Sequence, residues 1–151
     1  MKKIACVLSV ILVVVVGAII AGIAAEPKTS NAPFLKPAEA VAKMSIPEGF
    51  EVKIFAAEPD IGEPIAFCFD DRGRLWVVEN YSYPEWQEGQ HDRIVIFEDV
   101  DNDGQFDRRK VFLEQGEHLT GIEIGFGGIW CTAPPYLIFI PDRDQDDRPD
   151  G

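Results

Sequence analysis

The sequence is poor in the residues that many enzymes use for catalysis or for holding a cofactor. It has three cysteines and two histidines among 151 residues, and no CxxC or CxxCH motif occurs. These spacings are typical of redox dithiols, zinc sites and covalently attached haem. A nucleophile motif, a phosphate-binding glycine loop and zinc-ligand spacing are also missing. The sequence therefore excludes these chemistries for its own residues.

Basic residues are outnumbered by acidic ones. The chain has 14 Lys and Arg against 26 Asp and Glu, which gives a formal net charge of -12. Binding to nucleic acid needs a basic surface that faces the phosphates, so nucleic acid is excluded as a partner. The acidic residues concentrate in two segments, the first Asp loop (residues 99–107) and the second Asp loop (residues 142–150). Local carboxylate clusters of this kind favour divalent cations.

A single long apolar run, residues 4–23, follows Lys2 and Lys3 and precedes Ala24 and Ala25. This order of basic, apolar and small residues is typical of an export signal, so we expect a periplasmic or cell-surface protein. The run also approaches the length that spans a bilayer, and membrane anchoring through it stays open. The predicted organisation is a signal peptide or anchor over 1–25, a linker with a short helix over 26–45, and a folded domain over 46–151.

A unit of short strands occurs twice in the folded domain. The first copy contains Arg74-Leu75-Trp76, an apolar strand and the first Asp loop; the second contains Gly128-Ile129-Trp130, an apolar strand and the second Asp loop. A repeat of about 40 to 50 residues made of short strands is typical of a β-propeller blade. We therefore predict an all-β fold, a partial β-propeller of about two blades. A β-sandwich of about eight strands would explain the strand number but not the repeat.

Alternating apolar and polar residues predict the first strand, and further short runs with Gly, Asp or Pro in nearly every gap predict the others. They are 52–56, 65–69, 75–78, 93–98, 110–113, 119–124, 129–132 and 136–140. Good helix formers after Pro37 predict a short helix over 37–44. The strand at 52–56 precedes the first unit, and we expect it to complete a last blade built from residues outside this sequence. Without that blade, strand edges would be left unpaired.

The two cysteines of the folded domain are interpreted as buried free thiols. An exported protein could pair them in a disulfide. However, the repeat places Cys68 in the first strand of one unit and Cys131 in the second strand of the next, and this placement does not establish a contact between them.

Both Asp loops have a spacing that suits Ca²⁺, which prefers six to eight oxygen ligands from a flexible loop. The ligand candidates are Asp99, Asp101, Asp103, Asp107 and the backbone carbonyl of Gln105 in the first loop, and Asp142, Asp144, Asp146 and Asp150 in the second. Gly104 suits a sharp turn, and Asp147 takes its place in the second loop. We predict structural calcium ions; the alternative is a pair of exposed Asp-rich turns without metal.

The segment between residues 79 and 92 is an insertion that the second unit lacks. Its candidate contact residues for a carbohydrate or protein are Tyr81, Tyr83, Trp86 and His91. The alternative is that the aromatic rings form a small core of their own. His118, ahead of a predicted strand, is a weak candidate for a general base, because a single His in a turn seldom has a catalytic role.

Several segments resemble the membrane-bound dehydrogenase family of planctomycetes and related bacteria. They are Ser-Ile-Pro-Glu-Gly-Phe-Glu-Val (45–52), Ala-Glu-Pro (57–59), Phe-Asp-Asp-Arg-Gly-Arg-Leu-Trp-Val-Val-Glu (69–79), Thr-Gly-Ile-Glu-Ile-Gly-Phe-Gly-Gly-Ile-Trp (120–130) and Phe-Ile-Pro-Asp-Arg-Asp (139–144). The resemblance implies a propeller similar to glucose/sorbosone dehydrogenases, often followed by helical repeats and a cytochrome c domain. It implies pyrroloquinoline quinone or haem only in regions outside this sequence, and no cofactor-binding residue can be carried over.

We therefore expect an N-terminal fragment of an exported, sugar-dehydrogenase-like propeller oxidoreductase that is itself inactive. The whole protein would oxidise a sugar or related alcohol and pass the electrons to a quinone. One alternative is a non-catalytic, calcium-stabilised propeller module that binds a glycan or a protein. Another is a short chain that assembles blades from several copies.

Overall fold

The computed structural model describes residues 34–84 and 89–150, and these residues form a mostly β structure. The predicted leader or anchor over 1–25 and the predicted contact by Trp86 lie outside the described residues. Within the described part of the chain, no helix is long and apolar enough to cross a membrane. The expected short helix is α2 (Pro37–Ala42), with proline in its first turn, where a missing N–H does no harm.

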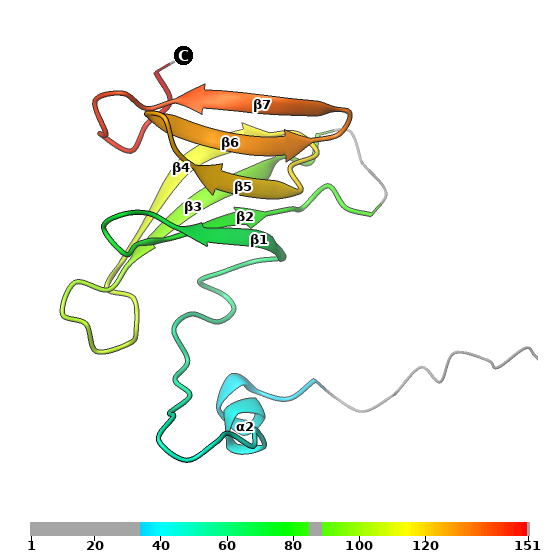
Figure 1. The fold of residues 1–151 in the computed structure, drawn as a ribbon. Coiled ribbons are helices and arrows are strands. Elements are labelled where there is room, and N and C mark those ends of the chain that lie inside the picture. Colours follow the sequence, from blue (N-terminus) through cyan, green and yellow to red (C-terminus); the bar gives the residue numbers. More distant parts are fainter. Residues whose placement is uncertain (1–33, 85–88, 151) are drawn as a thin grey trace, which may run out of the picture. The chain divides into compact units, whose positions relative to one another are not determined.

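Seven strands form two antiparallel sheets (Figure 1). Sheet A has the strand order β1-β2-β3-β4, and sheet B has the order β5-β6-β7. Sheet A contains β1 (Pro64–Phe69), β2 (Leu75–Glu79), β3 (Asp92–Glu98) and β4 (Arg108–Gly116). Sheet B contains β5 (Gly121–Ile124), β6 (Gly128–Ala133) and β7 (Tyr136–Pro141). The prediction of an all-β fold is confirmed, and so are these seven strands.

The predicted strand at 52–56 is wrong. These residues pair with no strand of the structure. They accept one backbone hydrogen bond from the first Asp loop, in which the N–H of Phe106 donates to the carbonyl of Phe55 at 3.4 Å. Phe55, expected on the exposed face, packs against the apolar cluster around Phe97, whereas Ile54, expected on the buried face, is 36% exposed. An alternating pattern forms a strand only where a partner strand can pair with its backbone groups.

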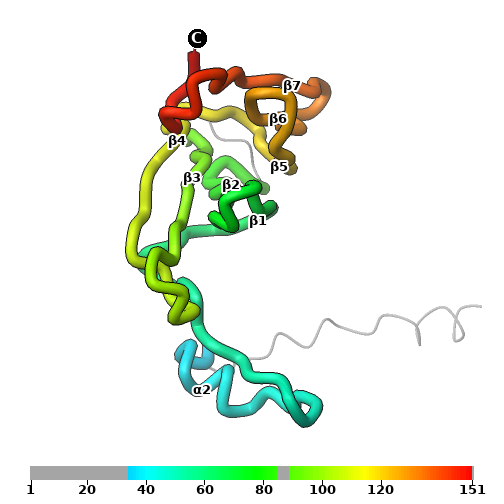
Figure 2. The backbone as a smooth tube through the Cα atoms, turned by 60° about the vertical axis from the view of Figure 1, so that its left-hand side comes forward, coloured from blue at the N-terminus to red at the C-terminus, as the bar shows by residue number. Residues whose placement is uncertain are grey.

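The main core lies between the two sheets. Side chains on one face of sheet A are covered by sheet B, and β5 lies next to β1 (Figure 1, Figure 2). Trp76, Val78, Ile94 and Ile96 of sheet A are at most 3% exposed there. Sheet B contributes Ile122, Ile124, Ile129, Cys131, Ala133, Ile138 and Ile140. Burial of each large apolar side chain contributes about 1.5–3 kcal/mol, so this core is the main reason for the sheet packing.

Both cysteines of the domain lie in this core as free thiols, as predicted. Cys131 is fully buried and Cys68 is half-buried. Burial, with a smaller contribution from Cys68, raises the pKa of the Cys131 thiol to about 12. Burial is also the main cause that raises the pKa of Cys68 to about 11. Neither group is therefore a thiolate near neutral pH.

A second apolar cluster covers part of the opposite face of sheet A. Val77, Val95 and Phe97 are buried there under the segment that contains Phe55. The ring of Phe106, from the first Asp loop, packs edge-on against Phe97 with 5.0 Å between ring centroids. The unpaired segment before β1 therefore acts as a cover for sheet A rather than as one of its strands.

The antiparallel order separates the loops into two groups at the two ends of the strands (Figure 1). The Asp-loop end carries both Asp loops and the turns at 70–74 and 125–127. The opposite end carries residues 80–84 and 89–91, the turn at 117–120 and the turn between β6 and β7. The predicted metal loops and the predicted contact segment therefore lie at different ends of the sheets.

Candidate functional site

The first Asp loop is organised by carboxylates that accept hydrogen bonds from its own backbone. The Asp99 carboxylate accepts from the N–H groups of Asp103 at 3.2 Å and of Gly104 at 2.9 Å. Asp107 Oδ2 accepts from the N–H of Val100 at 2.6 Å. These contacts hold the first and the last carboxylate of the loop on its inner side.

The second Asp loop repeats this arrangement. Asp142 Oδ1 accepts from the N–H of Asp146 at 3.1 Å, and Asp150 Oδ2 accepts from the N–H of Arg143 at 2.8 Å. The N–H of Asp150 donates to the carbonyl of Pro141, as the N–H of Asp107 does to Glu98 in the first loop. Two segments with different residues between the aspartates therefore fold in the same way.

The backbone of both loops enters the left-handed region at the same two positions. These are Asn102 (φ 60°) and Gly104 (φ 90°) in the first loop, and Gln145 (φ 58°) and Asp147 (φ 61°) in the second. Asp147 thus adopts the left-handed conformation expected at the position of Gly104. Asn and Asp tolerate this region better than most residues with a side chain.

Each Asp loop brings three carboxylate oxygens within 4.8 Å of one another. The residues are Asp99, Asp101 and Asp107 in the first loop, and Asp142, Asp144 and Asp146 in the second. Oxygens that share one Ca²⁺ at about 2.3–2.6 Å lie no more than about 5 Å apart, so both groups fit the ion. Asp103 and Asp150 are outside these groups: the Asp103 carboxylate accepts from the N–H of Gln105 at 2.8 Å, and Asp150 lies 3.7 Å from Arg143 Nη1.

The second loop concentrates negative charge on a buried group. Asp142 is 7% exposed, and burial is the largest cause that raises the pKa of its carboxyl. The neighbouring carboxylates of Asp147, Asp146 and Asp144 raise it further. A bound cation would remove this repulsion, because it favours the ionised form of each ligand.

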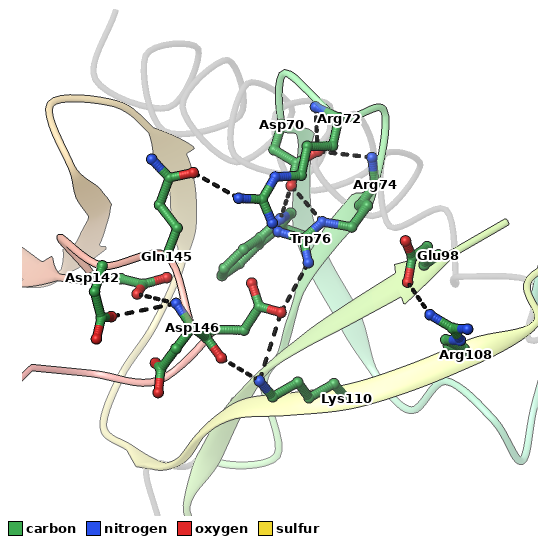
Figure 3. Close-up of polar contacts among 12 residues, drawn as sticks. Asp70, Arg72, Arg74, Trp76, Glu98, Arg108, Lys110, Asp142, Gln145 and Asp146 are labelled. Atoms are coloured by element: carbon green, nitrogen blue, oxygen red, sulfur yellow. Dashed lines mark hydrogen bonds and ion pairs between the residues drawn. The ribbon is translucent and has the colours of Figure 1, made fainter. Parts of the chain in front are cut away.

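The second Asp loop is also linked to sheet A by cationic side chains (Figure 3). Arg74 Nη1 lies 2.9 Å from Asp147 Oδ2, and Lys110 Nζ lies 3.6 Å from the same oxygen. Arg72 Nη2 donates to Gln145 Oε1 at 2.6 Å. These contacts join residues far apart in the sequence, so the position of the second loop depends on how the two sheets pack.

A cleft of about 330 Å³ opens where the two sheets meet at the Asp-loop end. Its walls are the turn at 70–74, the turn at 125–128 and the side of the second Asp loop that carries Asp142. Phe126 lies at this cleft with a φ of 58° and with 96% of its surface exposed. The cleft is large enough for a small molecule.

Asp70 is the centre of the hydrogen bonds at the base of this cleft (Figure 3). Its carboxylate accepts from Trp76 Nε1 at 3.0 Å and from Arg74 Nε at 2.7 Å, and from the N–H groups of Arg72 and Arg74. Burial opposes ionisation of Asp70, but these hydrogen bonds outweigh it and lower the pKa of the carboxyl below its usual value. Asp70 is therefore held as a carboxylate.

A buried polar network lies at the opposite end of the sheets. Asn80, Ser82 and Asp92 are at most 3% exposed. The Asp92 carboxylate accepts from the N–H of Ser82 at 3.0 Å and from the N–H of Leu119 at 2.8 Å, while Asn80 Nδ2 donates to the carbonyl of Leu119. The network therefore connects the segment after β2 to the turn that precedes β5.

Glu79 forms a second buried group at this end. It is fully buried, and its carboxylate lies 3.0 Å from Arg93 Nη2 and 3.2 Å from Arg109 Nη2. It also accepts from the N–H of Gly62 at 3.0 Å and from the hydroxyl of Tyr81 at 3.2 Å. Neither group of buried polar residues was predicted from the sequence; the available signal was a polar residue directly at the end of an apolar strand.

The family model described as a domain of unknown function, DUF7133, matches residues 36–151. The chain belongs to the DUF7133 family. The match covers both sheets and both Asp loops of the DUF7133 domain. No curated protein and no solved structure matches the chain.

The predicted contact residues of the DUF7133 domain separate into buried and surface groups. Tyr81 is half-buried, and the Arg93 guanidinium stacks on its ring at 4.8 Å, so Tyr81 belongs to the Glu79 group. Tyr83 is 59% exposed, and His91 and His118 are exposed at the same end of the sheets. His118 has a φ of 55° and directly precedes Leu119, which the buried network holds by both backbone groups.

The lowered pKa of Asp70 predicts a pH-dependent contribution to the stability of the DUF7133 domain. A carboxyl with a lowered pKa in the folded state stabilises the fold above its unfolded pKa, and this contribution is lost as the pH falls through the folded pKa. We expect Asp70→Asn to lower the free energy of unfolding most near pH 7 and progressively less below about pH 4. Urea unfolding at pH 7, 5 and 3 measures this difference.

The matched control is Asp71→Asn, because Asp71 is an exposed neighbour of Asp70. It should leave the unfolding free energy within about 0.5 kcal/mol at every pH. An Asp70→Asn effect that stays constant from pH 7 to pH 3 would contradict the role of ionised Asp70.

Proposed function

We propose that this DUF7133 domain consists of two consecutive β-propeller blades whose Asp loops hold structural Ca²⁺. The observation that carries this proposal is the common geometry of the two Asp loops. They share their hydrogen bonds and their two left-handed positions, and each follows the third strand of its sheet. Loops of the same shape at the same place in two packed sheets are what a repeated, ion-stabilised unit requires.

Apolar surface on the outside of the packed sheets supports a propeller over a β-sandwich. A two-sheet sandwich buries one face of each sheet and leaves polar residues outside. Here the outer face of sheet A exposes Phe67 and Phe69 at 66% and 62%, and the outer face of sheet B exposes Leu137 at 66%. Blades of a propeller need apolar residues on both faces, because each blade lies between two others.

In each loop the proposed ion is bound by the three clustered carboxylates, with water and backbone carbonyls completing the ligand set. When bound, the cation neutralises the local charge and fixes the hairpin. In the second loop we expect the bound ion also to stabilise the packing of the two sheets, because Arg74 and Lys110 of sheet A contact Asp147 of that loop.

We expect Ca²⁺ at about 100 times its dissociation constant to raise the Tm of the chain by about 10 °C for each of the two occupied sites, relative to chelator. Asp101→Asn combined with Asp144→Asn should remove this difference and leave the Tm in chelator nearly unchanged, because these two side chains are exposed members of the two carboxylate groups. Differential scanning calorimetry with and without Ca²⁺ measures both values.

Asp71→Asn serves as the control, because it removes one exposed carboxylate of the same type outside the two groups. It should retain the full calcium effect. A wild-type Tm that is equal in Ca²⁺ and in chelator would reject the metal role and favour the interpretation as Asp-rich turns.

We further propose that the blades belong to an exported or membrane-anchored oxidoreductase of the glucose/sorbosone dehydrogenase type. The support is the resemblance over residues 45–52, 69–79 and 120–130, together with the exposed His118 at the end opposite the Asp loops. The quinone or haem that accepts the electrons would be held by residues other than those of this chain. A glycan- or protein-binding module is the second candidate, and the open cleft of about 330 Å³ favours it.

Redox cofactor content distinguishes the two candidates. The full-length oxidoreductase, isolated from its own cell envelope, should show quinone or haem absorption, and after reconstitution with pyrroloquinoline quinone it should reduce a dye acceptor in the presence of a sugar. A preparation without either cofactor and without activity after reconstitution would favour the binding module.

A further inference from the structure

Phe126 occupies a position in which it does little to stabilise the fold. It is the first of the two central residues in the turn between β5 and β6, where the N–H of Gly125 donates to the carbonyl of Gly128 at 3.0 Å. Phe126 and Gly127 both have a positive φ, 58° and 74°, as a type I′ turn requires. Asn, Asp or Gly is the usual residue at such a position, because the left-handed region strains a bulky side chain. Phe126 is also 96% exposed, so burial of its ring does not offset this strain.

The fold holds Phe126 at the rim of the cleft between the two sheets. The N–H of Asp142 donates to the carbonyl of Gly127 at 3.0 Å, which ties the turn to the second Asp loop. Trp76 and Ile129, which are at most 3% exposed, give the cleft an apolar lining next to the ring. Strained residues persist where their surroundings hold them, and they concentrate at ligand-binding and active sites. A strained, exposed ring beside a cleft therefore indicates a role in binding.

The cleft also carries polar side chains from both of its sides (Figure 3). Arg72, in the turn after β1, donates from Nη2 to Gln145 Oε1 of the second Asp loop at 2.6 Å. Both side chains line the cleft and are exposed to solvent. A guanidinium has five N–H donors and a glutamine amide has two, and the bond between these residues uses one of the arginine donors. The two planar groups orient each other and present hydrogen-bond donors at the cleft.

The charges around the cleft offset one another. Four aspartates and two arginines line it. Arg74 lies 2.7 Å from Asp70 and 2.9 Å from Asp147, and Lys110 lies 3.6 Å from Asp147. Asp142 belongs to the carboxylate group of the proposed calcium ion in the second loop, and the remaining arginine offsets the remaining aspartate. This balance favours a neutral ligand over a cation or an anion.

We propose that this cleft binds one ring of a neutral carbohydrate. Phe126 stacks on the apolar C–H face of the sugar ring, and Arg72 and Gln145 bind its hydroxyl groups. A sugar combines an apolar face with hydroxyls that both donate and accept, which matches an aromatic ring beside oriented polar groups. The cleft volume of about 330 Å³ suits a small ligand of this size. The inference deepens the second candidate function, the glycan-binding module, and rests on it.

The packing of further blades leaves this cleft open. The cleft lies at the ends of the strands, between sheets A and B, whereas the blades of a propeller pack against one another through the faces of their sheets (Figure 1). Phe126 therefore differs from Leu137, whose exposed side chain lies on the outer face of sheet B. Both sides of the cleft come from the two sheets of this chain, so the proposal does not depend on the length of the polypeptide.

The test titrates the full chain with cellopentaose, maltopentaose, xylopentaose and N-acetylchitopentaose, in Ca²⁺ and in a detergent whose headgroup is not a sugar. Isothermal titration calorimetry should show binding of at least one of them. Phe126→Asn should weaken this binding at least about tenfold, because it removes the aromatic contact. The same substitution should raise the Tm by about 4 °C, because Asn suits the turn better than Phe. A residue with only a structural role would lose stability when replaced, so the opposite signs identify a binding residue.

Two control variants define the role of the ring. Phe126→Tyr keeps a stacking surface and should bind within about threefold of the wild type. Tyr136→Asn removes an exposed ring at the other end of sheet B and should bind as the wild type does. A wild type that binds none of the oligosaccharides would overturn the proposal. Binding that Phe126→Asn and Arg72→Ala leave unchanged would also overturn it, but would keep the glycan-binding function at another surface. The calcium effect on Tm, measured on the same preparations, tests the structural ions separately.

Discussion

Asp92→Ala is expected to lower the free energy of unfolding by about 3–5 kcal/mol. The Asp92 carboxylate is fully buried and accepts from the N–H and hydroxyl of Ser82 and from the N–H of Leu119. Alanine leaves the two buried N–H groups without this acceptor, whereas the Ser82 hydroxyl can still donate to Asn80 Oδ1, and each unsatisfied group costs about 1–3 kcal/mol. Urea denaturation followed by tryptophan fluorescence measures the change.

Asp92→Asn separates the hydrogen bonds from the charge. The amide keeps one acceptor oxygen but places an N–H₂ donor where Ser82 or Leu119 also donates, so we expect an intermediate loss. Asp71→Ala, at an exposed position, should change the free energy of unfolding by less than about 0.5 kcal/mol. If Asp92→Ala were as mild as Asp71→Ala, the network would not join the two loops in solution.

Glu79→Ala is expected to destabilise the domain by about 3 kcal/mol, at the lower end of the range for breaking a buried ion pair. Glu79 is fully buried, whereas the side chains of Arg93 and Arg109 are 35% and 26% exposed. Removal of the carboxylate leaves two neighbouring guanidinium groups facing each other and orphans the N–H of Gly62. Because both arginines retain access to water, the loss stays below that of a fully buried pair.

The matched control for Glu79 is Glu98→Ala. Glu98 pairs with Arg108 at 3.5 Å, but the two side chains are 39% and 70% exposed, so the expected loss is below about 1 kcal/mol. Chemical denaturation of both variants at the same pH gives the comparison. Similar losses for Glu79→Ala and Glu98→Ala would show that burial does not strengthen the Glu79 group.

Most strands could be predicted because their information is local. The observed strands are short apolar or alternating runs separated by turn residues, and each pairs with a neighbour close in sequence. The segment at 52–56 alternates as a strand should but has no neighbouring strand, so its pattern predicted a strand that does not form. The pattern reports which side chains are apolar and does not report whether a backbone partner is present.

The Asp loops were predictable for the same local reason, and the buried polar groups were not. The spacing of Asp99, Asp101 and Asp107 determines a loop whose hydrogen bonds are internal, and even the left-handed conformation of Asp147 follows from its alignment with Gly104. The predicted ligands Asp103 and Asp150 accept hydrogen bonds from the N–H groups of Gln105 and Arg143, and their role as ligands stays a prediction.

Contacts between distant segments were decided by tertiary structure alone. Asp92 meets Leu119, Glu79 meets Arg109, and Arg74 meets Asp147 only because strands bring them together. Hydrogen bonds and ion pairs act over a few ångströms and depend on geometry, so a sequence pattern that repeats every two residues cannot encode their partners. Strand positions and metal-loop spacing are thus local properties of this chain, whereas its buried polar networks, its cleft and its two open apolar faces arise from the packing of one sheet on the other.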